Sequence, residues 1–167
     1  MVENEKIGIV ILMTNAYFPV GVRFVKRFMQ FYKGNRRVKF FMFSDIDPKD
    51  YLPEGIDYLY IHTTNKNWVE GTNLKFKSIL NLMTFYPVPL AECSEIYYFD
   101  SDTNVDKEFT EEWFSGELVA GQHFDDQGRM KEVKNFERNP RSKAYIPYDT
   151  KLPQVYLYGA FWGGAVE

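Results

Sequence analysis

The chain has 167 residues, of which 45% are hydrophobic and 18% aromatic, enough apolar material for one sizeable core. Its net charge of −3 and pI near 5.5 argue against a nucleic-acid binder that works by neutralising phosphates. The single cysteine, Cys93, excludes an internal disulfide and is compatible with a reducing compartment. No apolar run approaches transmembrane length, and the acidic, polar N-terminus is unlike a signal peptide. We therefore expect a cytoplasmic protein without a membrane anchor.

Predicted strands and helices alternate along the chain. Continuous apolar or aromatic runs predict buried strands, and apolar residues at helical spacing predict helices. In chain order we expect a strand over 6–13, a helix over 18–32, strands over 38–43 and 56–61, a helix over 72–86, a strand ending at Asp100, a short acidic helix over 110–114 and a strand over 118–121. This alternation predicts an α/β fold, a mostly parallel sheet flanked by helices, in a single domain over 1–167. Ligands then bind at the carboxyl ends of the strands.

Polar residues follow three of the predicted strands, at Thr14-Asn15, Ser44-Asp45 and Asp100-Ser101-Asp102. Asp100 and Asp102 point the same way if the backbone stays extended, and two carboxylates so close need a cation between them. A hard divalent ion such as Mn²⁺ or Mg²⁺ meets that need and keeps positions open for phosphate oxygens. The same residues also suit a plain turn or helix cap, so both interpretations stay open on this motif alone.

The last third of the chain contains two further motifs. Residues 137–147 read ERNPRSKAYIP, and residues 156–166 read YLYGAFWGGAV. Small residues between aromatic ones let a backbone approach a ligand closely while the rings form the walls of a pocket. The same pattern also suits a tightly packed strand with glycine bulges.

In combination, these motifs resemble glycosyltransferase family 6, which includes the histo-blood-group A and B transferases, the α-1,3-galactosyltransferases and bacterial relatives. The resemblance rests on the two segments just quoted, on Phe28-Met29 followed by RVKFFMFSD over 37–45, on Trp68 spaced before Leu74-Lys75, on Asp100-Ser101-Asp102, and on GQH over 121–123. Agreement in the same order across residues 6–167 is more specific than any one motif.

The resemblance implies a GT-A fold and a retaining, metal-dependent transfer of galactose or N-acetylgalactosamine from a UDP-sugar to a glycan acceptor. Asp100 and Asp102 would hold Mn²⁺, with Mg²⁺ as the alternative, against the diphosphate. The resemblance puts the donor at Leu12, Met13, Thr14, Tyr17, Lys75, Ser101, Gly159 and Ala160, and the acceptor at His123 and Asn135. Lys75 stands where many members have an arginine that touches the donor sugar and a carboxylate of the metal motif. Lysine keeps that charge but loses the bidentate fork.

The catalytic residue stays unknown. In the family a further half-domain with the proposed glutamate nucleophile follows the Gly-Gly strand, whereas this chain stops at Glu167, so we expect it to be incomplete at the C-terminus. Glu137 is a candidate to replace the missing glutamate nucleophile, although its segment is structural in the family. Three interpretations stay open: a retaining transferase, a domain that binds UDP-sugar and metal without transfer, and a non-enzymatic interaction domain. An apolar edge left exposed by the missing half would predict a homo-oligomer.

Overall fold

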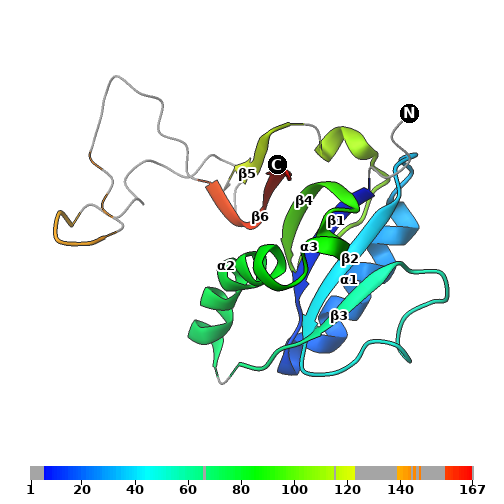
Figure 1. Ribbon diagram of the computed structural model, residues 1–167, viewed down its shortest axis with the longest axis horizontal. Helices are drawn as coiled ribbons and strands as arrows, with labels where there is room; N and C mark the ends of the chain where they lie inside the picture. Colours follow the sequence, from blue (N-terminus) through cyan, green and yellow to red (C-terminus); the bar gives the residue numbers. More distant parts are fainter. Residues whose placement is uncertain are drawn as a thin grey trace. The chain divides into compact units, whose positions relative to one another are not determined.

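The computed structural model describes residues 6–65, 67–114, 116–122, 139–143, 145, 147 and 157–166 (Figure 1). The chain divides into two compact units. One contains the residues up to 119 and from 160 onwards, and the other contains residues 120–159. Each unit is described by itself, and the account below concerns the first unless stated otherwise.

The centre of the fold is a six-stranded mixed sheet with the order β3-β2-β1-β4-β6-β5. Its strands are β1 (Lys6–Leu12), β2 (Val38–Ser44), β3 (Tyr58–His62), β4 (Cys93–Asp100), β5 (Leu118–Gln122) and β6 (Leu157–Ala165). β1 pairs in parallel with both β2 and β4, β2 pairs in parallel with β3, and β6 runs antiparallel to β4. The predicted α/β fold with a mostly parallel sheet is confirmed.

Among the described residues, the strands are connected by the α-helices α1 (Phe18–Phe31), α2 (Trp68–Phe85) and α3 (Pro87–Leu90), and by the 3-10 turns Asn15–Tyr17 and Glu111–Phe114. α2 begins at Trp68 rather than at the predicted Thr72 because Asn67 caps it, its side chain accepting a hydrogen bond from the backbone N–H of Glu70 at 2.9 Å. α3 was not predicted. Pro87 ends α2 and also begins α3, where a proline loses no helical hydrogen bond.

The helices cover the two faces of the sheet separately, with α1 on one side and α2 and α3 on the other (Figure 1). Alternate residues of each strand enter different cores, which explains why β1 and β2 are mostly apolar on both faces, with Lys6 and Lys39 as the charged exceptions. The core on the α1 face includes Ile7, Ile9, Ile11, Phe24, Phe28, Phe40, Tyr97, Phe99 and Phe114. The core on the α2 face includes Val10, Phe41, Phe43, Ile61, Leu82, Leu90, Cys93 and Tyr98.

Two glycines of β6 allow it to pack closely against its neighbours. A Cβ atom on Gly163 would collide with the carbonyl oxygen of Ile96 and with Tyr97, and one on Gly164 would collide with the carbonyl oxygen of Glu117. Real side chains do not tolerate such contacts with backbone atoms. The packed-strand interpretation of this segment therefore accounts for both glycines.

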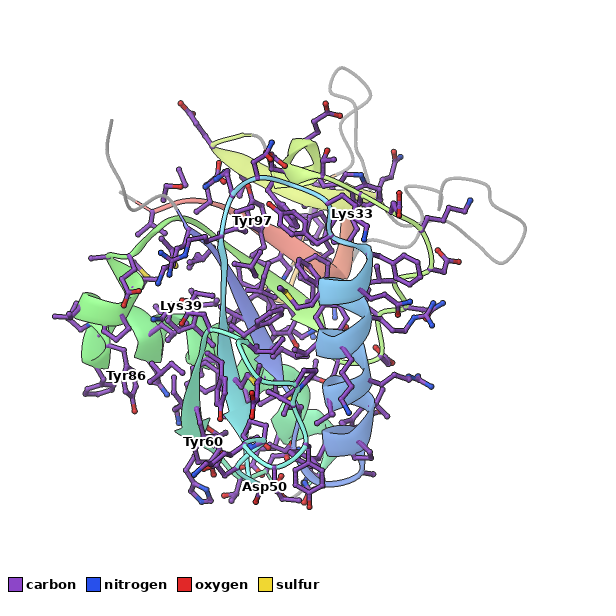
Figure 2. The ribbon with its side chains drawn as sticks, turned by 90° about the vertical axis from the view of Figure 1, so that its right-hand side faces the viewer. Lys33, Lys39, Asp50, Tyr60, Tyr86 and Tyr97 are labelled. Carbon is purple, nitrogen blue, oxygen red and sulfur yellow. The ribbon has the colours of Figure 1, made fainter. Side chains whose placement is uncertain are left out.

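A cluster of charges closes the amino ends of the strands on the α2 face. The Lys6 ammonium donates to Asp57 at 2.7 Å and to Glu92 at 2.5 Å, and Lys39 (labelled in Figure 2) lies 3.0 Å from Glu92. Hydrogen bonds from Lys6 and then from Lys39 lower the pKa of the Glu92 carboxyl. Reciprocally, the bonds to Asp57 and Glu92 raise the pKa of Lys6.

Candidate functional site

A cavity of about 160 Å³ opens at the carboxyl ends of β1 and β4, beside the first turns of α2. This is the edge where parallel α/β sheets bind their ligands. The residues that line it are Leu12, Thr14, Tyr17, Asn65, Gly71, Thr72, Lys75, Tyr98, Asp100, Ser101 and Asp102. Two carboxylates and one ammonium group therefore face one small space.

The aspartate pair reaches the cavity by a turn and not by an extended strand. β4 ends at Asp100, which lies opposite Leu12 of β1, and the N–H of Thr103 bonds back to the carbonyl of Asp100 at 3.0 Å. The intervening Ser101 is buried, whereas Asp102 is exposed. The backbone does not stay extended through Asp102, because the chain folds back at the end of the sheet, so the condition under which the two side chains would point the same way is not met. Both carboxylates nevertheless line the cavity.

Two donors meet at one oxygen of Asp100. The hydroxyl of Tyr98 donates to Oδ1 at 2.8 Å, and the Nζ atom of Lys75 lies 3.5 Å from the same oxygen. The Lys75 ammonium also lies over the Tyr98 ring, 5.5 Å from its centroid. Burial of Tyr98, followed by the nearby charge of Asp100, raises the pKa of its hydroxyl far above the usual value, so the phenol stays a hydrogen-bond donor.

A chain of asparagines joins the carboxyl ends of β1, β2 and β3. Asn15 adopts a positive φ of 55°, and its backbone N–H donates to Asp45 at 2.9 Å. Its side-chain amide donates to the carbonyl and to the side-chain oxygen of Asn65, and Asn65 donates to the carbonyl of Asn67, the cap of α2. The strand ends at Thr14-Asn15 and Ser44-Asp45, which the sequence singles out, are therefore joined by direct hydrogen bonds.

Most of the predicted donor and metal positions meet at the cavity: Leu12, Thr14, Tyr17, Lys75, Asp100, Ser101 and Asp102 all line it. Met13 does not. Its side chain is fully buried against α1, its N–H donates to Phe43, and its carbonyl accepts the Ser44 hydroxyl. Ala160 is buried in β6 and is not among the lining residues.

Gly159 belongs to the second unit. His123, Asn135 and Glu137 lie outside the described residues. His62, at the end of β3, is exposed and its Nδ1 lies 3.0 Å from the hydroxyl of Tyr60.

Four lining residues were not predicted from the sequence: Asn65, Gly71, Thr72 and Tyr98. Tyr98 had a usable signal, because it precedes Asp100 by two positions in a strand and must share its face. Thr72 also had a signal, because it precedes Lys75 by three positions in the predicted helix and lies on the same face, whereas Gly71 would have followed only from an earlier start of α2 at the Asn67 cap. Asn65 had no local signal, because its place depends on contacts with residues remote in the sequence.

The donor set suits a hard divalent cation. Carboxylate oxygens are the preferred protein ligands of Mg²⁺ and Mn²⁺, and the neighbouring hydroxyl of Tyr98 orients one of them. Within the described residues, no group of three or more His, Cys, Asp or Glu side chains could hold a metal. Mg²⁺ in proteins is usually held by one or two carboxylates together with waters and substrate phosphates. Asp100 and Asp102, which line the same cavity, fit a metal site of that kind.

A second cavity, of about 180 Å³, lies on the opposite face of the sheet beneath the segment that follows Asp102. Five aromatic residues form one part of its wall, and the segment over 103–108 forms the remainder. Its lining residues are Phe28, Phe99, Thr103, Asn104, Val105, Asp106, Lys107, Glu108, Phe109, Trp113 and Phe114. Unlike the first cavity, it offers little chemistry beyond apolar contact.

Comparison with known proteins does not assign the chain to a family. No protein-family model matches it, and no curated protein matches it at a significant level. Within the part of the chain that the structure describes, no helix is both long enough and apolar enough to cross a membrane.

Proposed function

We propose that the chain binds a UDP-sugar together with a divalent metal ion and transfers its galactose or N-acetylgalactosamine to a glycan acceptor with retention. The observation that carries this proposal is the cavity at the carboxyl ends of β1 and β4, where Asp100, Asp102 and Lys75 face the same space. The ordered resemblance of the sequence to glycosyltransferase family 6 supports the same function.

Six of the lining residues have a role in this proposal. Asp100 and Asp102 would hold Mn²⁺ or Mg²⁺, and the metal, when bound, supplies a Lewis acid for the departing UDP. Lys75 would add positive charge beside the diphosphate. Tyr17, with 44% of its surface exposed, offers a ring on which a uracil base stacks. The hydroxyl groups of Thr14 and Ser101 would bind the ribose.

A second candidate function is donor binding without transfer. Among the described residues that line the cavity, the only carboxylates are Asp100 and Asp102, and both are assigned to the metal. No described carboxylate at the cavity is left to act as a nucleophile. The sugar-selecting pair Gly159 and Ala160, the acceptor positions, a homo-oligomeric state and a cytoplasmic location stay predictions.

Isothermal titration with UDP, with and without Mn²⁺, tests the binding step. We expect Mn²⁺ to strengthen UDP binding to the wild type. In Asp102→Ala, we expect this increase in UDP affinity to be smaller by about tenfold or more, because removal of a ligand weakens metal binding. Asp106→Ala is the matched control, because Asp106 is an exposed carboxylate of the same segment on the opposite face. No UDP binding, with or without Mn²⁺, would favour the interaction-domain interpretation instead.

A transfer assay with UDP-galactose and UDP-N-acetylgalactosamine separates the two candidates. Metal-dependent release of UDP that is stimulated by glycan acceptors identifies a transferase. Binding without acceptor-stimulated turnover identifies the domain as a donor-binding unit.

A further inference from the structure

Asp100 is already paired with a cation that belongs to the chain. The Nζ atom of Lys75 lies 3.5 Å from Oδ1, and its side chain is only 12% exposed, against 32% for Asp100. An ion pair that is partly withdrawn from water is worth more than one on an open surface. Lys75 is thus in place to neutralise the carboxylate when no other cation is present.

A divalent ion held by Asp100 and Asp102 would meet this ammonium at close range. Two cations that share one carboxylate repel each other, and each weakens the binding of the other. The lysine stem consists of single bonds that rotate freely, so the ammonium can leave Asp100 without movement of the helix backbone. The phosphate groups of a nucleotide in the same cavity would provide its next partner.

We propose that Lys75 is an exchangeable counter-ion of Asp100, which Mn²⁺ displaces and which then binds the phosphate groups of the ligand. This inference rests on the metal and nucleotide site proposed above. In the absence of nucleotide, Lys75 would compete with the metal for Asp100. In its presence, Lys75 would stabilise the complex of the chain with metal and nucleotide. One residue thereby couples metal binding to nucleotide binding.

Tyr98 keeps the carboxylate in position during this exchange. Its hydroxyl bonds to the same Oδ1 atom at 2.8 Å, carries no charge and therefore does not compete with a metal. Its ring is 3% exposed and stacks on Trp162 at 5.7 Å, which fixes the direction of the hydroxyl. Tyr98 is accordingly a positioning residue for Asp100, both before and after Lys75 leaves.

The test measures Mn²⁺ binding without nucleotide, by the loss of the free-ion signal in electron paramagnetic resonance. We expect Lys75→Met to bind Mn²⁺ about five- to tenfold more tightly than the wild type, because the opposing charge is gone. At saturating Mn²⁺, the same variant should bind UDP several-fold more weakly. A merely structural lysine would move both affinities in the same direction. Lys77→Met, an exposed lysine of the same helix, is the control and should change neither.

The outcomes separate this inference from the proposed function. If Lys75→Met binds Mn²⁺ no more tightly than the wild type, or shows no binding up to millimolar metal, Lys75 is not a competing counter-ion, even where metal-dependent UDP binding is found. If Mn²⁺ binding tightens but UDP never binds, the competition stands and the nucleotide site fails.

A second variant tests the positioning role. Tyr98→Phe keeps the ring and its stacking but removes the hydroxyl, and it should weaken Mn²⁺ binding about threefold, in the Lys75→Met background as well. Unchanged Mn²⁺ affinity in both backgrounds would exclude that role.

Discussion

The α1 face of the sheet is packed with aromatic and aliphatic side chains, whereas the α2 face carries charged groups at both ends of its strands. On the α1 face, Phe28 is fully buried and its ring lies 5.0 Å from that of Phe109 and 5.5 Å from that of Phe40. On the α2 face, Lys6 pairs with carboxylates at the amino ends, and Lys75 pairs with Asp100 at the carboxyl ends. One face thus supplies most of the apolar packing, and the other holds the groups that can bind a charged ligand.

The largest expected effect comes from removing the central ring of the α1 face. Phe28→Ala should lower the free energy of unfolding by about 3–5 kcal/mol, since it leaves a cavity among rings that cannot close around it. Urea denaturation of Phe28→Ala and of Phe76→Ala makes the comparison, because Phe76 lies on α2 with 59% of its surface exposed. We expect less than about 1 kcal/mol for Phe76→Ala. Equal losses in the free energy of unfolding for the two variants would contradict the larger contribution expected from the Phe28 ring on the α1 face.

A smaller effect is expected at Asn15, in the turn that borders the first cavity. Asn15→Ala should cost about 1–2 kcal/mol, because alanine is strained at a φ of 55° and loses the bonds to Asn65. Asn15→Gly keeps that backbone conformation and loses only the side-chain bonds, so it should cost clearly less. If both variants lost the same amount of stability in thermal unfolding, the hydrogen bonds rather than the backbone would account for the effect.

The smallest effect concerns the charges at the amino ends of the strands and depends on pH. Because the fold lowers the pKa of Glu92 below its usual 4.5, the ionised carboxylate stabilises the protein above that pH, and this contribution is lost as the pH falls through the lowered pKa. Glu92→Gln should therefore be less stable by about 1 kcal/mol at neutral pH, and the difference should vanish in acid. Lys6, whose pKa is raised, stays charged throughout this range and therefore does not change how stability varies with pH.

Stability curves from pH 7 down to about pH 3 check this, a range that spans the ordinary carboxyl pKa values. Glu108→Gln is the matched control, since Glu108 is 71% exposed and lies 3.9 Å from its lysine partner. If the difference in free energy of unfolding between the wild type and Glu92→Gln were the same at every pH, the assigned role of Glu92 would be contradicted.

The sequence predicts the sheet well because the evidence for it is local. Mostly apolar runs indicate that β1 and β2 are covered on both faces, although Lys39 interrupts the run in β2, and polar residues mark the strand ends near the cavity. Features that depend on contacts between remote segments were missed. The turn after Asp100 needs a buried Ser101, and the place of Asn65 depends on Asn15 and the cap of α2. The family resemblance puts Met13 at the donor, yet Gly21 of α1 admits its side chain into the core.

The pairing of β1 with β4 also bears on the order of folding. Leu12 and Asp100 lie opposite each other in the sheet, but β2, β3 and α2 all intervene along the chain. Contacts between such remote segments close a long loop and form slowly. The carboxylates, Lys75 and the Asn15 turn consequently come together only once that pairing exists. We therefore expect the cavity at the carboxyl ends of β1 and β4 to form late during refolding, after α1 and the neighbouring β1–β2 pair.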